Sequence, residues 1–113
     1  MNKGLKLYFY QNNALFKKIV FSNDKKLVVI IGTGDQAGVK LSNRLISSAH
    51  AQLVYDTNNQ LHLQDLNSTN GTYLNGFKIE SSRSYILNPK DKIQLAEANG
   101  VLITVETLET KSL

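Results

Sequence analysis

The chain has 113 residues, of which 42% are hydrophobic and 19% charged, a composition that fits one globular domain with one core and excludes a disordered tail. It has no cysteine, which excludes disulfides, thiolate nucleophiles and zinc–thiolate sites, and its longest apolar run, Leu27 to Ile31, is too short to cross a bilayer. Its net charge is +4. Because the first ten residues contain no signal-peptide core, we expect a cytoplasmic protein without a membrane partner.

Short apolar or alternating runs follow one another along the chain, separated by turn residues. This pattern is typical of a β-sandwich or barrel, and no clear long helix competes with it. The predicted strands are, in chain order, Leu5–Tyr10, Ala14–Phe21, Leu27–Ile31, Val39–Leu41, Ala51–Tyr55, Leu61–Asp65, Thr72–Leu74, Phe77–Ile79, Ser84–Leu87, Lys92–Leu95 and Val101–Thr107. We therefore predict an all-β fold in a single domain, residues 1–113, ending in a loose tail at 108–113.

Asparagine–glycine dipeptides mark the sharpest predicted turns. They occur at Asn70-Gly71, Asn75-Gly76 and Asn99-Gly100, and each tolerates the positive φ angles of a tight hairpin. Turns this frequent predict antiparallel neighbours. Strict alternation in the last run, Val101–Thr107, predicts one buried and one solvent-exposed face.

Lysine supplies most of the positive charge, much of it near the N-terminus. Six of these lysines are Lys3, Lys6, Lys17, Lys18, Lys25 and Lys26. A lysine-rich nucleic-acid-binding domain is one alternative interpretation. We favour a solvated lysine-rich face on edge strands, because nucleic-acid binders usually show denser basic patches with interleaved exposed aromatic side chains.

A second alternative is a dinucleotide-binding fragment. The apolar run Val28–Ile31 leads into Gly32-Thr33-Gly34-Asp35-Gln36-Ala37, which satisfies the pattern G-x-G-x-x-G/A, and Asp56 lies where an acidic residue would bind a ribose. This fold needs a helix after the glycines and further strand–helix units. The rest of the chain offers short strands and hairpin turns instead, so the glycine pattern alone is a weak signal.

The segment from Asp65 to Gly76 reads DLNSTNGTYLNG and resembles the signature loop and hairpin of forkhead-associated (FHA) domains. Upstream, Ser47-Ser48-Ala49-His50 matches the S-x-x-H element of that family. Downstream, Leu87 to Ala96 resembles its closing L-x-x-G-D-x-I-x-L-G stretch, with two glycines replaced. The resemblance covers about Val28 to Val105, which is most of the chain.

This resemblance implies an FHA-like β-sandwich of about eleven mostly antiparallel strands, whose loops at one end bind a phosphothreonine peptide. Such sites hold the doubly charged phosphate through charge-assisted hydrogen bonds. The expected function is protein–protein interaction, as a stand-alone signalling adaptor whose partner is a protein or a phosphothreonine-containing peptide. The resemblance implies no cofactor and no metal.

Carried over residue by residue, the resemblance assigns the binding role to two loops. Ser47 would donate its hydroxyl to the phosphate, Asn70 would hold the peptide backbone, and Thr69 would form part of the pocket wall. Structural roles are expected for His50, which would brace the loops from beneath, and for Gly32, Gly71 and Asn75.

The sequence departs from the family pattern at Thr33, where an arginine usually follows the glycine. Hydrogen bonds to charged groups are worth about 1.5–3 kcal/mol each, so the loss predicts phosphate binding weakened by about tenfold to several hundredfold, or lost. Ser48 also stands where many relatives have a cation. The candidates to compensate are Arg44, in the same loop, Lys40, just before it, and the Thr33 hydroxyl, which keeps one neutral hydrogen bond to donate. Thr33, Ser48 and Arg44 are therefore expected among the peptide-binding residues.

An enzyme is not expected. A hydrolase using Ser47 and His50 would need a nucleophile on a strained turn and an acidic partner for the histidine, and the chain has neither a G-x-S-x-G motif nor an acid at a telling spacing. We therefore predict no catalytic residues.

Overall fold

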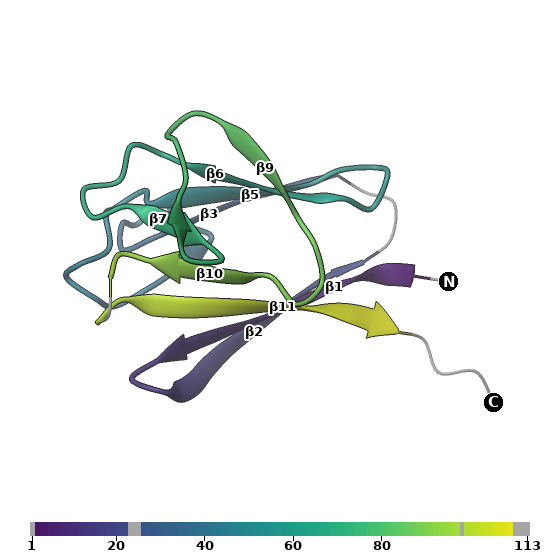
Figure 1. Ribbon diagram of the computed structural model, residues 1–113, viewed down its shortest axis with the longest axis horizontal. Helices are drawn as coiled ribbons and strands as arrows, with labels where there is room; N and C mark the ends of the chain where they lie inside the picture. Colours follow the sequence, from purple (N-terminus) through teal and green to yellow (C-terminus); the bar gives the residue numbers. More distant parts are fainter. Residues whose placement is uncertain (1, 23–25, 98, 110–113) are drawn as a thin grey trace.

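The computed structural model describes residues 2–22, 26–97 and 99–109, and these ranges form two β-sheets packed face to face (Figure 1). One sheet has six strands in the order β2-β1-β11-β10-β7-β8: β2 (Ala14–Ser22), β1 (Asn2–Gln11), β11 (Val101–Glu109), β10 (Lys92–Leu95), β7 (Thr72–Leu74) and β8 (Phe77–Lys78). The other has five in the order β4-β3-β5-β6-β9: β4 (Val39–Lys40), β3 (Leu27–Gly32), β5 (Ala51–Tyr55), β6 (Leu61–Asp65) and β9 (Ser84–Leu87).

All eleven predicted strands are present, and the predicted all-β sandwich is confirmed. Among the paired strands, only β3 and β4 run parallel. The other pairs are antiparallel, as the frequent hairpin turns predicted. β11 runs to Glu109, so the first two residues of the expected tail at 108–113 are strand, and 110–113 lie outside the described residues. None of the described ranges forms a helix long and apolar enough to span a membrane.

The dinucleotide-binding alternative is wrong. Residues 33–38 form turns, and no helix follows them before β5. Gly32 allows two chain segments to approach closely, because a Cβ there would lie 2.0 Å from the carbonyl oxygen of Ser48. Gly32 therefore lets the loop before β5 pack against the end of β3. In a dinucleotide-binding fold, the same glycine would instead let a pyrophosphate approach the backbone.

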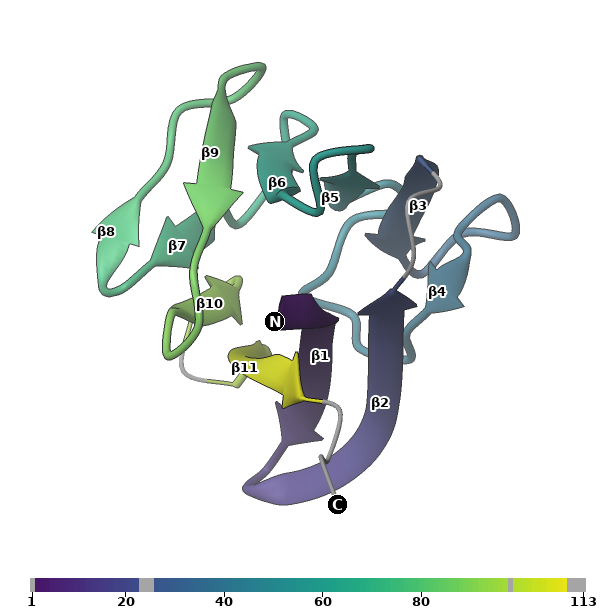
Figure 2. The same cartoon turned by 90° about the vertical axis from the view of Figure 1, so that its right-hand side faces the viewer.

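The core lies between the inner faces of the two sheets, and Figure 2 shows β9, β6, β5, β3 and β4 facing β10, β11 and β1 across it. Alternate residues of β5 and β6 are buried, as the period of two in a half-buried strand requires. Phe21 of β2 and Tyr55 of β5 join the sheets, with ring centroids 5.4 Å apart. Fully buried side chains of this size contribute about 1.5–3 kcal/mol each.

Candidate functional site

Three loops meet at the end of β3: the β3–β4 loop (33–38), the β4–β5 loop (41–50) and the β6–β7 loop (66–71). Backbone hydrogen bonds join the first two, since the Thr33 and Gly34 amides each donate at 3.1 Å to the carbonyl oxygens of Ser47 and Ser48. The β4–β5 loop is thereby held along its length against the end of the five-stranded sheet.

Side chains join the second loop to the third. The backbone amide of Thr69 donates to Ser47 Oγ at 3.0 Å, and Asn70 Nδ2 donates to the carbonyl oxygen of Leu45 at 2.8 Å. The structure thus brings Ser47, Thr69 and Asn70 together, as the sequence analysis expected. Ser47 is half-buried, whereas Thr69 and Asn70 are exposed and can meet a ligand.

His50 lies beneath these loops with its ring fully buried. Its Nδ1 accepts from the Ser47 backbone amide at 3.1 Å, so Nε2 carries the proton and donates to the carbonyl oxygen of Gly71 at 2.8 Å. Burial lowers the pKa of His50, although the Gly71 carbonyl and nearby Asp65 act in the opposite direction. The imidazole contacts the Ser47 backbone and leaves Ser47 Oγ to Thr69, so the pair is not arranged as nucleophile and base.

Asp65, at the end of β6, organises the β6–β7 loop, a role that the sequence analysis missed. Its carboxylate accepts from the hydroxyls of Ser68 at 2.5 Å, Thr72 at 2.6 Å and Ser81 at 2.6 Å. Burial alone would raise the pKa of Asp65, but these hydrogen bonds outweigh it and lower that pKa. Ser68 Oγ in turn accepts the Gly71 amide at 3.1 Å. An aspartate followed by serine three residues later was the available sequence signal.

Asn43 is a second residue that the sequence analysis missed. Its Oδ1 accepts the Leu45 amide at 2.9 Å, and its Nδ2 donates at 2.9 Å to the carbonyl oxygen of Asn99, in the turn before β11. The side chain therefore ties the β4–β5 loop to the six-stranded sheet. No pattern in the sequence pairs these two distant asparagines.

Thr33 Oγ1 donates to the carbonyl oxygen of Ile46 at 3.4 Å. Next to it is a polar hollow lined by Thr33, Lys40, Leu41, Ser42, Asn43, Arg44 and Ile46. Lys40 is paired with Asp35 at 2.7 Å, whereas the exposed Arg44 makes no ion pair within the described residues. Ser48 is exposed at the neighbouring loop position.

Asn75 and Gly71 hold the hairpin that follows the β6–β7 loop. Asn75 has a φ of 51° and donates through Nδ2 to Asp91 Oδ1 at 3.0 Å, while its Oδ1 accepts the Lys92 amide at 2.9 Å. Gly71 has a φ of 87°, a conformation that favours glycine. Among the residues that the structure describes, no cluster of three or more His, Asp or Glu side chains could hold a metal ion.

Comparison with known sequences finds a match between residues 29–96 and the family model of the FHA domain. The probable E3 ubiquitin-protein ligase dma1 of Schizosaccharomyces pombe is 32% identical over 66 residues, 55% of this chain and 24% of the relative. A probable serine/threonine-protein kinase of Dictyostelium discoideum is 31% identical over 105 residues, 80% of this chain and 7% of the relative. The chain thus spans about a quarter or less of the length of these relatives.

Comparison with solved structures finds the same sandwich. The FHA domain of the CT664 protein from Chlamydia trachomatis has a TM-score of 0.77 at 24% identity, with 93% of this chain and 98% of that chain covered. An FHA domain solved for an analysis of phosphothreonine-dependent FHA domain interactions has a TM-score of 0.73 at 24% identity, with 94% and 98% covered. With a family model that matches more than half of its residues, the chain belongs to the FHA domain family, whose members are generally protein-interaction modules rather than enzymes.

Proposed function

We propose that this FHA domain binds a phosphothreonine-containing segment of a partner protein across the loops that carry Ser47 and Asn70, with a weakened grip on the phosphate. The observation that carries the proposal is the hydrogen bond from the Thr69 amide to Ser47 Oγ at 3.0 Å. It fixes the serine oxygen as an acceptor, and within the described residues the hydroxyl proton has no acceptor of its own. That proton can therefore be donated to a phosphate oxygen.

The Asn70 side chain also has hydrogen-bonding groups available to a ligand. One amide hydrogen goes to the Leu45 carbonyl, and the described residues offer no partner to the second hydrogen or to Oδ1. A free donor beside a free acceptor matches the carbonyl and amide of an extended peptide. The exposed Asn70 side chain would therefore hold the peptide backbone next to the phosphothreonine, with Thr69 beside it.

The reduced affinity for phosphate follows from Thr33. Its hydroxyl already donates to Ile46, and no guanidinium replaces the missing arginine at that position. Arg44, in the adjoining hollow and without an ion pair among the described residues, supplies the nearby positive charge. We infer an affinity about tenfold to several hundredfold below that of a site with a bidentate arginine.

Calorimetric titration with a phosphothreonine peptide library and with its unphosphorylated counterpart tests the proposal. We expect the phosphorylated library to bind more tightly, and Ser47→Ala and Asn70→Ala each to remove most of that difference, because each deletes a hydrogen bond to the ligand. Ser84→Ala on β9 and Asn58→Ala between β5 and β6 are matched controls that lie outside the three loops. Equal affinity for both libraries would instead show a domain that binds partners without phosphate.

A further inference from the structure

The outward-facing side chains of the six-stranded sheet form two rows that run across the strands. Directly paired residues of neighbouring strands share a face, so the strand register defines each row. The first row is Leu15, Tyr10, Leu102, Gln94 and Tyr73. The second row is Lys18, Tyr8, Thr104 and Lys92.

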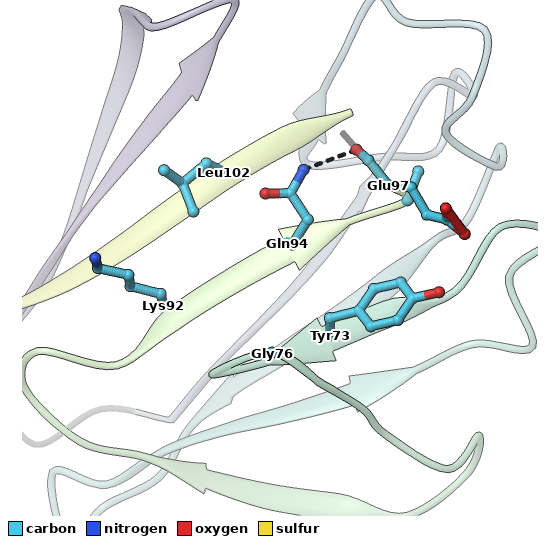
Figure 3. Close-up of a pocket in the computed structure, with 7 residues that line it drawn as sticks. Tyr73, Gly76, Lys92, Gln94, Glu97 and Leu102 are labelled. Atoms are coloured by element: carbon cyan, nitrogen blue, oxygen red, sulfur yellow. Dashed lines mark hydrogen bonds between the residues drawn. The ribbon is translucent and has the colours of Figure 1, made fainter. Parts of the chain in front are cut away.

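The first row contains an open hollow with a largely apolar lining. Figure 3 shows Gln94 between Tyr73 and Leu102, and Lys92 and Glu97 also line this hollow. Gln94 Nε2 donates to the carbonyl oxygen of Glu97 at 3.0 Å, which fixes the amide and leaves Oε1 without a partner in the described residues. A ring ligand can stack on the tyrosine and bond to this amide, which is how single-stranded bases are recognised on sheet surfaces.

The second row consists entirely of hydrogen-bond donors. Ammonium groups at Lys18 and Lys92 flank the hydroxyls of Tyr8 and Thr104. Lysine, tyrosine and threonine are all side chains that contact phosphate oxygens in nucleic-acid complexes. The two rows are two residues apart along the strands, or about 7 Å, which is comparable with the reach of one nucleotide from base to phosphate.

Charge distinguishes this face from the outer face of the other sheet. The two rows contain Lys18 and Lys92, and Lys78 extends the first row beyond Tyr73, while Lys6, Glu97 and Glu106 lie beside the rows. The corresponding rows of the five-stranded sheet contain no lysine or arginine: Val28, Val54, His62 and Ile86, and Ile30, Gln52, Gln64 and Ser84. The fold therefore interleaves aromatic and basic side chains that are scattered in the sequence, with Lys6 Nζ 5.8 Å from the Tyr8 ring centroid.

We propose that this face binds single-stranded nucleic acid, with bases over the row from Tyr10 to Tyr73 and phosphates along the row from Lys18 to Lys92. A strand running across a β-sheet places successive bases on successive strands, which matches the direction of both rows. An acidic peptide would satisfy the lysines but would leave the rings of Tyr10 and Tyr73 without a stacking partner. This site adjoins the phosphopeptide loops, because a Cβ at Gly71 would lie 3.3 Å from the Tyr73 ring, but it uses none of the side chains proposed to bind the phosphopeptide.

Fluorescence anisotropy of labelled oligothymidylate and oligouridylate, titrated with the full chain at several salt concentrations, tests the proposal. We expect binding at low salt that weakens with a log–log slope of about −1.4 to −2, as for two or three phosphate contacts on a single strand. Tyr73→Ala and Tyr10→Ala should each weaken binding by about fivefold to a hundredfold, because each removes a stacking surface. Lys92→Gln should reduce the slope by about 0.7.

Matched controls separate the site from general charge and from loss of folding. Phe77→Ala removes an aromatic ring that is 78% exposed on the opposite face of β8 from Lys78, and Lys26→Gln removes a lysine outside this sheet, so neither should change the affinity. Tyr73→Phe keeps the ring and should bind like the unaltered chain. Three results would each overturn the proposal: no binding at low salt, affinities unchanged by both tyrosine-to-alanine variants, or polyglutamate of equal length binding as tightly as the oligonucleotides.

Discussion

The buried His50 ring connects the β4–β5 and β6–β7 loops, which are far apart in the sequence. Its Nδ1 accepts the Ser47 amide and its Nε2 donates to the carbonyl oxygen of Gly71, so it holds Ser47 close to Gly71, the neighbour of Asn70. These two bonds require a neutral imidazole with its proton on Nε2, since a protonated Nδ1 could not accept. The geometry of these two loops therefore depends on the protonation state of one scaffold histidine.

The lowered pKa of His50 predicts a pH-dependent stability. Unfolding returns this pKa to its ordinary value of 6.5, so the unfolded chain takes up a proton that the folded chain rejects. The stabilisation is present above pH 6.5 and is lost as the pH falls from there through the folded pKa. Thermal unfolding should show a lower midpoint at pH 5.5 than at pH 7.5. A His50→Gln variant should be less stable at pH 7.5 and change less between the two conditions; an equal change would contradict the prediction.

Thr33 predicts a gain of phosphate affinity on substitution. Thr33→Arg would place a guanidinium beside Ser47, where the Thr33 and Ser47 backbones are already joined, and a bidentate contact should strengthen phosphopeptide binding by about tenfold or more. Arg44→Gln should weaken it, because this arginine is the nearby cation without an ion pair among the described residues. Titration with phosphorylated and unphosphorylated peptides measures both effects. Lys26→Gln is the charge-matched control, and an equal loss there would show a general effect of net charge.

Individual residues could be predicted where a local motif carries the information. The serine and asparagine motifs placed Ser47 and Asn70 together, and the structure shows their loops joined. Asp65 was missed although Ser68, three residues later, is a local signal for its role. Its contact with Ser81, from beyond β8, and the contact of Asn43 with Asn99, 56 residues away, are set by the fold and are visible only in three dimensions.

At the scale of elements, the eleven strands could be predicted because alternation and asparagine–glycine turns both report directly on local structure. The largest errors are at two strand ends: β1 begins at Asn2 rather than Leu5, and β11 ends at Glu109 rather than Thr107. These two strands pair with each other, Asn2 opposite Glu109, so each extends the other. Such mutual extension depends on a pairing that the sequence does not display.

Two glycines, Gly32 at the end of β3 and Gly76 in the turn between β7 and β8, predict different costs of substitution. Gly76→Ala should destabilise by about 1–3 kcal/mol, through its φ of 89° alone, because nothing lies within 4 Å of the added Cβ. Gly32→Ala should cost more, because its Cβ would lie 2.0 Å from the Ser48 carbonyl oxygen and push the β4–β5 loop away from β3. Urea denaturation measures both. Gly32→Ala should also weaken phosphopeptide binding while Gly76→Ala leaves it unchanged, and the reverse order of costs would contradict this account.

At the scale of the molecule, the sandwich presents two candidate surfaces, which adjoin where the Tyr73 ring lies beside Gly71. The loops with Ser47 and Asn70 lie at the end of β3, whereas the rows of tyrosines and lysines lie on the outer face of the six-stranded sheet. The sequence predicted the first surface through motifs. The second surface could not be predicted from the sequence, because Tyr10, Leu102 and Tyr73 come together only through the β1–β11–β10–β7 pairing.

The central claim is that phosphothreonine recognition takes place where the β4–β5 and β6–β7 loops meet. Amide chemical-shift mapping of the full chain with one peptide, phosphorylated and unphosphorylated, tests it most directly. We predict that the phosphorylated peptide shifts the amides of Thr33, Ser47, Thr69 and Asn70, and that the unphosphorylated peptide leaves them nearly unchanged. Identical shifts with both peptides, or shifts that avoid these four residues, would contradict the account.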